Sequence, residues 1–173
     1  GAVYCHPESH IDDDECGAPE FYTGGAKLVG VEGAHGKLVA ADLDAALAGA
    51  GKGTVHHVQP AVLSLTNATE AGTAYTPAET AALADVAHRH GIKVHVDGAR
   101  FANAIAHLGC SAADASWRAG VDILSFGATK NGCMAAEAIV VFDAGLAETL
   151  AFRRKRAGHL FSKMRYIAAQ MDA

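Results

Sequence analysis

The fold is decided by two stretches of the chain, IKVHVDGARFANA at Ile92–Ala104 and DILSFGATK at Asp122–Lys130. Each contains a short apolar run with the pattern of a buried strand. The first run ends on Asp97, and the second leads through small residues to Lys130. In open α/β sheets, ligands lie beyond the carboxyl ends of the strands. We therefore expect the two strands to present a carboxylate and an amine to one crevice.

A carboxylate and an amine in this arrangement suit pyridoxal phosphate. This cofactor needs a lysine that forms a Schiff base and an acid that keeps the ring nitrogen protonated. The lysine must be neutral when it attacks the cofactor aldehyde, which favours a partly desolvated site. The alternative interpretation makes Asp97 an ordinary residue of a strand-end turn and Lys130 an ordinary surface lysine.

A well-marked helix precedes the first of these strands. Thr76 is placed to cap it, Pro77 occupies the first helical position, Glu79 completes a capping box and Gly91 ends it. The stretch before it, residues 54–65, is rich in β-forming residues and is expected to be interrupted by a proline, because proline cannot donate to a central ladder. Strand, helix and strand then form a βαβ unit with parallel strands.

The remaining pattern alternates between strands and helices along the chain. We expect strands within residues 1–11, 26–31 and 137–142, and helices within residues 10–24, 40–50, 101–108, 111–119, 144–156 and 159–171. The acidic run Asp12–Asp14 is interpreted as favourable charge at a helix N-terminus. Such alternation predicts an α/β fold with a mostly parallel sheet and helices on both faces.

Composition and charge exclude several functional classes. The chain has 173 residues, which predicts one main domain, and its net charge of −5 argues against a nucleic-acid partner. Its one basic cluster, Arg153–Arg156, is typical of a solvated helix face. Four cysteines without CxxC spacing and ten histidines without an HExxH motif give no indication of a metal site. No run is apolar enough for a membrane span, and we expect a cytoplasmic protein.

Five ordered motifs resemble one known family. They are HVDGAR, SFGATKNG, SLTNATEAGTAYTP, the early SHIDDDECGA and the late RKRAGHLFSKMR. Together they resemble the low-specificity L-threonine aldolases, which are fold-type-I enzymes that depend on pyridoxal phosphate. The resemblance implies a three-layer α/β/α large domain of the fold-type-I transferase-like kind over residues 1–157. Residues 158–173 would begin a small C-terminal domain. The resemblance also implies that the chain is an internal segment of a longer protein, with the phosphate-binding loop before Gly1 and most of the small domain after Ala173.

The resemblance also assigns roles to single residues. Lys130 would bind the cofactor covalently, Asp97 would bind its ring nitrogen, and Thr129 would lie beside it. Arg100 would contact the cofactor and hold the substrate carboxylate, for which a guanidinium is suited. His10 would stack on the cofactor ring, with Glu15 as a nearby acid.

The substrate pocket departs from the family in one respect. Asn67 and Thr69 would edge the pocket, but many family members have a histidine where this chain has Thr69, and that histidine handles the β-hydroxyl group of the substrate. The resemblance then leaves His10, acting through water held with Glu15, as the base.

The activity implied by the resemblance is cleavage of L-threonine and related β-hydroxy-α-amino acids to glycine and an aldehyde. Two alternatives stay open at this point. One is another fold-type-I lyase reaction, by β-elimination or hydroxymethyl transfer, and the other is an inactive fragment of such an enzyme. We expect a small amino-acid substrate, a homodimer or homotetramer, no nucleic acid and no membrane. We also expect the 173 residues alone to bind pyridoxal phosphate poorly and to be inactive.

Overall fold

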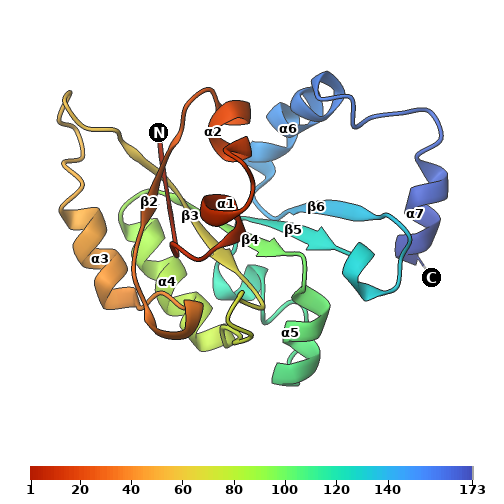
Figure 1. Ribbon diagram of the computed structural model, residues 1–173, viewed down its shortest axis with the longest axis horizontal. Coiled ribbons are helices and arrows are strands. Elements are labelled where there is room, and N and C mark those ends of the chain that lie inside the picture. Colours follow the sequence, from red (N-terminus) through yellow and green to blue (C-terminus); the bar gives the residue numbers. More distant parts are fainter. Residues whose placement is uncertain (173) are drawn as a thin grey trace.

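The sheet is the central element of the computed structural model, which describes residues 1–172 (Figure 1). Its strands lie in the order β2-β1-β3-β4-β5-β6. Their bounds are β1 Ala2–Cys5, β2 Lys27–Gly30, β3 Pro60–Thr66, β4 Lys93–Gly98, β5 Ile123–Gly127 and β6 Glu137–Val141. The first five pair in parallel and β6 pairs antiparallel with β5. The predicted mostly parallel sheet is confirmed.

Helices lie on both sides of this sheet, as the sequence predicted. They are α1 His10–Asp13, α2 Ala18–Thr23, α3 Ala40–Ala48, α4 Pro77–Arg89, α5 Phe101–Leu108, α6 Ala144–Arg156 and α7 Arg165–Asp172, with three short 3-10 turns at Ala34–Gly36, Trp117–Ala119 and Thr129–Asn131. In Figure 1, α3, α4 and α5 lie below the sheet, whereas α2 and α6 lie above it.

The two faces of the sheet differ in chemistry. The face toward α4 carries an apolar set whose members are almost fully buried: Leu63, Leu65, Val94, Val96 and Leu124. The strand register places the alternate side chains on the other face, where Ser64 lies beside His95 and Asp97 beside Ser125. Because successive side chains of a strand point to opposite faces, the functional carboxylate lies on the polar face.

Helix α4 begins as predicted, with reciprocal bonds at its N-terminus. The Thr76 hydroxyl accepts a hydrogen bond from the backbone N–H of Glu79, and the Glu79 carboxylate accepts one from the backbone N–H of Thr76 at 2.8 Å. These bonds satisfy donors that the first helical turn leaves without partners. The helix therefore starts at Pro77 and carries the chain back to the start of β4.

Three expectations about element bounds are wrong. Pro60 begins β3 instead of interrupting a strand, because a proline is tolerated at the first residue of a strand. Residues 111–119 form turns and a short 3-10 segment in place of a helix, because only one helical turn closes, from the Ala115 N–H to the Ser111 carbonyl. Farther along, the N–H of Arg118 bonds the Ala113 carbonyl, five residues back. The last helix begins only at Arg165, after Gly158 has adopted a positive φ of 78°.

Within the described residues, we find no helix with the length and apolar character that a bilayer span requires.

Candidate functional site

Asp97 and Lys130 lie at the carboxyl edge of neighbouring strands. Asp97 is the fifth residue of β4 and pairs in register with Ser125 of β5. Lys130 lies in the 3-10 turn Thr129–Asn131, which directly follows β5. Because β4 and β5 are parallel, both residues emerge at one edge of the sheet. The side chain of Lys130 is exposed and that of Asp97 is half-buried.

The turn after Asp97 depends on close contact between the strands. The Asp97 carboxylate accepts a hydrogen bond from the backbone N–H of Ala99 at 3.0 Å. A Cβ atom at Gly98 would lie 2.6 Å from Leu124 Cδ1 and 2.9 Å from the backbone oxygen of Ser125. Only glycine fits at such a distance without a shift of the neighbouring strand. The Asp-Gly pair therefore sets where the carboxylate leaves the sheet.

A polar row lies on the same face, one step below Asp97. The imidazole of His95 bonds the Ser64 hydroxyl through Nδ1 and the Ser125 hydroxyl through Nε2, each at 2.9 Å. Burial lowers the pKa of His95, and the Asp97 carboxylate only partly opposes this effect. A neutral imidazole with two hydroxyl partners satisfies all three side chains. The row thus supports the strands that carry Asp97.

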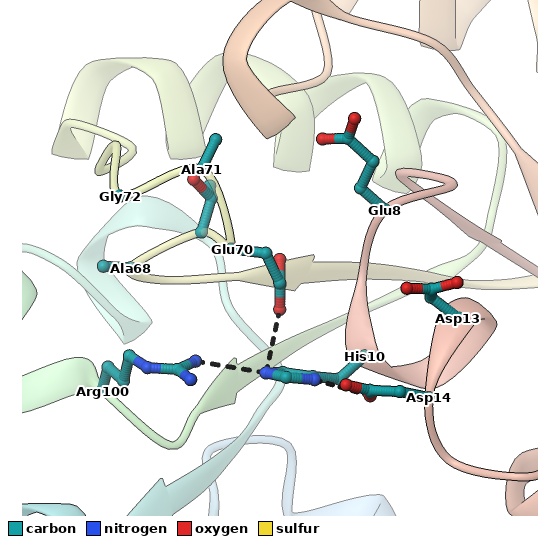
Figure 2. Close-up of a pocket in the computed structure, with 10 residues that line it drawn as sticks. Glu8, His10, Asp13, Asp14, Ala68, Glu70, Ala71, Gly72 and Arg100 are labelled. Carbon is teal, nitrogen blue, oxygen red and sulfur yellow. Dashed lines mark hydrogen bonds and ion pairs between the residues drawn. The ribbon is translucent and has the colours of Figure 1, made fainter.

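His10 is the centre of the cavity at this edge (Figure 2). Its Nδ1 atom lies 2.6 Å from an Asp14 carboxylate oxygen. Its Nε2 atom lies 3.3 Å from an Arg100 guanidinium nitrogen and 3.5 Å from a Glu70 carboxylate oxygen. Residues from α1, from the loop after β3 and from the start of α5 thus meet at one imidazole ring.

The surrounding cavity has a volume of about 550 Å³, which lies within the range of small-molecule sites. Three chain segments contribute its lining: Glu8, His10, Asp13 and Asp14; Ala68, Thr69, Glu70, Ala71 and Gly72; and Arg100. The structure therefore brings His10, Arg100 and Thr69 of the sequence-predicted residues into one cavity.

Other sequence-predicted residues are engaged elsewhere. The side-chain amide of Asn67 is buried and makes two bonds of 3.1 Å to the backbone of Tyr75. The Thr69 hydroxyl lies 2.7 Å from the Thr73 hydroxyl. The Thr129 hydroxyl accepts a bond from the backbone N–H of Ala136 at 3.1 Å. These bonds fix the loops at the strand ends, and the binding roles of the three residues stay predictions.

The sequence interpretation did not assign a site role to two acids, Asp14 and Glu70. Asp14, which we expected to favour a helix N-terminus, follows the last residue of α1 and bonds His10. Exposed Glu15, which was predicted, lies in the same cluster: one of its carboxylate oxygens is within 4.8 Å of a ring nitrogen of His10 and of a carboxylate oxygen of Asp14. Glu70 had no local signal beyond its place four residues after β3. Contacts between segments 60 residues apart are not visible in a sequence pattern.

A family model described as beta-eliminating lyase matches residues 1–172. The chain belongs to the beta-eliminating lyase family. Among its relatives, a low-specificity L-threonine aldolase of Pseudomonas aeruginosa is 48% identical over 169 residues, which are 97% of this chain and 48% of that protein. A second such enzyme, from a Pseudomonas species, is 44% identical over the same shares. The chain spans about half the length of these curated relatives.

A solved structure agrees with this placement in the beta-eliminating lyase family. Threonine aldolase of Leishmania major superposes with a TM-score of 0.87 at 31% identity, over 98% of this chain and 48% of that one. A PLP-bound aminotransferase-like structure from Clostridium difficile, at 14% identity and a TM-score of 0.61, shares the fold.

The charges at the sheet edge fit a bound pyridoxal phosphate. Among residues 1–172, none of Asp97, Arg100 and Lys130 forms a salt bridge. An acid without an ionic partner can pair with the ring nitrogen of the cofactor, and an amine can react with its aldehyde. A guanidinium without an ionic partner can bind the carboxylate of an amino-acid substrate. The chemistry of these residues is therefore consistent with this cofactor.

Proposed function

We propose that the protein carrying this chain cleaves L-threonine and related β-hydroxy-α-amino acids to glycine and an aldehyde. The observation that carries the proposal is the sheet edge at which Asp97 and Lys130 emerge, both without a salt bridge within the described residues. Arg100, three residues after Asp97, adds a guanidinium that lies 3.3 Å from the imidazole of His10. When bound, pyridoxal phosphate supplies an electron-accepting ring that stabilises the electron pair left on the glycine carbon.

Four residues of this chain have different roles in the proposed reaction. Lys130 would hold pyridoxal phosphate covalently, and Asp97 would keep its ring nitrogen protonated. Arg100 holds the substrate carboxylate in a fixed direction, which selects the bond that breaks. His10 takes the β-hydroxyl proton at Nε2, the ring nitrogen that faces Arg100 and Glu70. This direct transfer replaces the route through water held with Glu15, because Asp14 already occupies Nδ1.

The cofactor, the compartment and the assembly belong to the same proposal. All four cysteines are free thiols, which supports a reducing compartment such as the cytoplasm. The family resemblance supports a homodimer or homotetramer. Residues 1–157 would then belong to the large cofactor-binding domain, with residues 158–173 opening the small one.

A second candidate is β-elimination, which the description of the matched family favours. The two reactions yield different products. The test is incubation of the full-length protein with L-threonine and with L-serine, followed by product analysis. Glycine and acetaldehyde from L-threonine support the proposal. Pyruvate and ammonia from L-serine, without glycine formation, would overturn it.

A further inference from the structure

Glu70 approaches His10 on the side away from Asp14. Its Oε1 atom lies 3.5 Å from Nε2, and the two side chains keep only 20% and 22% of their surface exposed. Asp14 occupies Nδ1 at 2.6 Å, and Arg100 lies 3.3 Å from Nε2. Figure 2 shows Glu70 and Arg100 converging on the same nitrogen from different directions.

The loop that carries Glu70 is held from within. The backbone N–H of Thr69 bonds the Thr73 carbonyl at 2.9 Å, and the Gly72 N–H bonds the Thr69 carbonyl at 3.0 Å. The hydroxyl of Thr73 donates to the His35 carbonyl at 2.8 Å, which ties the loop to a second segment. These bonds hold the backbone from which the Glu70 side chain extends toward the imidazole.

The contact with Arg100 decides the proton arrangement of His10. A guanidinium only donates hydrogen bonds, so the Nε2 atom that faces it must offer a lone pair. The proton of the neutral ring then lies on Nδ1 and is donated to Asp14. With Arg100 in this position, a proton added at Nε2 would face a positive charge.

The contact with Glu70 favours the opposite state. An ionised carboxylate only accepts hydrogen bonds. Glu70 therefore cannot bond an unprotonated Nε2, but it can accept a hydrogen bond from Nε2 once that atom carries a proton. The imidazolium would then donate to Asp14 and to Glu70 together. The neutral ring is the partner of Arg100, and the charged ring is the partner of Glu70.

Resting on the proposed function, we propose that Glu70 is a positioning residue that turns His10 into a base when the substrate arrives. The substrate carboxylate attracts Arg100 and draws its guanidinium away from Nε2. Glu70 then stabilises the proton that Nε2 receives. Substrate capture and base activation are in this way one event, carried by three side chains.

The reaction at the β-hydroxyl group moves one proton and two electron pairs. The O–H bond of the β-hydroxyl breaks, its proton goes to Nε2 of His10, and its electron pair becomes the second carbon–oxygen bond of the aldehyde. The Cα–Cβ bond breaks, and its electron pair stays on the glycine carbon, which then takes up one proton. No oxidant or reductant is needed.

The other charged groups around His10 do not switch in this way. Asp14 faces Nδ1, which carries a proton in both states, and Glu15 belongs to the same acidic cluster. Glu8 and Asp13 line the cavity and add negative charge. Among residues 1–172, only Arg100 and Glu70 have contacts with Nε2 for which they compete.

The first test measures the proton affinity of His10 without catalysis. The full-length protein is freed of cofactor, and the imidazole of His10 is titrated by NMR, with its signal assigned by its loss in His10→Gln. We expect Glu70→Gln to lower the titration midpoint by about one pH unit and Arg100→Gln to raise it by a similar amount. Asp85→Asn, on the exposed side of α4, removes the same charge and should leave the midpoint unchanged.

The second test uses the pH dependence of the reaction. The acidic limb of kcat/KM reports the free enzyme, and that of kcat reports the substrate complex. In the unmodified protein, kcat should fall on the acidic side at a higher pH than kcat/KM does, because bound substrate has drawn Arg100 away from His10. Glu70→Gln should move the limb of kcat down by about one pH unit.

The outcomes separate this inference from the proposed function. A midpoint that Glu70→Gln leaves in place would overturn the inference, and so would a limb of kcat at or below that of kcat/KM. A protein that forms no glycine would refute the proposed function, whereas the NMR midpoints would still decide whether Glu70 and His10 are coupled.

Discussion

The carboxylate of Asp122 accepts a hydrogen bond from the backbone N–H of Val94 at 2.8 Å, which ties the residue before β5 to the start of β4. The same carboxylate lies 2.9 Å from His88 Nε2 and 3.3 Å from Lys93 Nζ. Asp97 and Lys130 leave the sheet from these two strands. The register that aligns them is therefore anchored at the opposite edge.

The Asp122 contacts predict an acid-dependent stability. Burial acts to raise the pKa of this carboxyl, but the bonds from His88, Val94 and Lys93 hold it below its ordinary value. A lowered folded-state pKa adds stability that is present above the unfolded value of about 3.9 and is lost as the pH falls through the folded value. Asp122→Asn should therefore destabilise the protein by about 2 kcal/mol at pH 7 and by less at pH 3. Urea titrations at both pH values measure this.

Asp114→Asn is the control for that series. The pKa of Asp114 is also lowered, by Ser111 and then Arg118, but the residue is exposed. Exposed ion pairs contribute little, so the loss at pH 7 should be smaller. Equal losses in the two variants would contradict the role given to Asp122.

The capping box of α4 gives a second prediction. Thr76→Ala removes the hydroxyl that accepts from the Glu79 N–H, and such a change costs about 1 kcal/mol. The apparent melting temperature should fall by a few degrees in a thermal scan. Thr54→Ala, in the loop before β3, is the control, and an equal loss there would show that the cap contributes nothing particular.

The sequence predicted α4 well because its signals are local. Thr76, Pro77 and Glu79 interact within one helical turn, and Gly91 follows the C-terminus with a φ of 75°. The strands carrying Asp97 and Lys130 were also predictable, because buried parallel strands are short apolar runs. The apolar spacing of residues 111–119 wrongly predicts a helix, because it does not show that the N–H of Arg118 bonds the carbonyl five residues back.

The partners of His10 show where sequence reasoning stops. Asp14 is only four residues from His10, and it reaches Nδ1 because it directly follows α1. Its acidic side chain alone does not indicate this contact. Glu70 reaches Nε2 only because β1 and β3 are neighbours in the sheet. Before the strand order is known, Glu70 cannot be told from an ordinary solvated acid.

Lys130 is the subject of the third prediction. Borohydride reduction of the full-length protein with pyridoxal phosphate, followed by peptide mapping, should place a pyridoxyl group on the peptide that contains Lys130. Lys130→Ala should remove this label and lower activity by more than the ~10²–10⁴-fold expected for loss of a general base. Lys163→Ala, between α6 and α7, should keep both. A label on another lysine would overturn the assignment.

Arg100 gives the last prediction, because its guanidinium is the group assigned to the substrate carboxylate. Lysine keeps the charge but loses the planar fork that binds a carboxylate through two bonds. Arg100→Lys should therefore raise KM for L-threonine about ten- to hundredfold, the range that corresponds to a charged hydrogen bond, with a smaller change in kcat. Steady-state kinetics at saturating cofactor measure both constants. Arg89→Lys is a matched control, because Arg89 lies at the end of α4 and faces Asp44 across 3.7 Å. An unchanged KM in Arg100→Lys would mean that another cation binds the carboxylate, and the release of His10 by substrate would then lack its trigger.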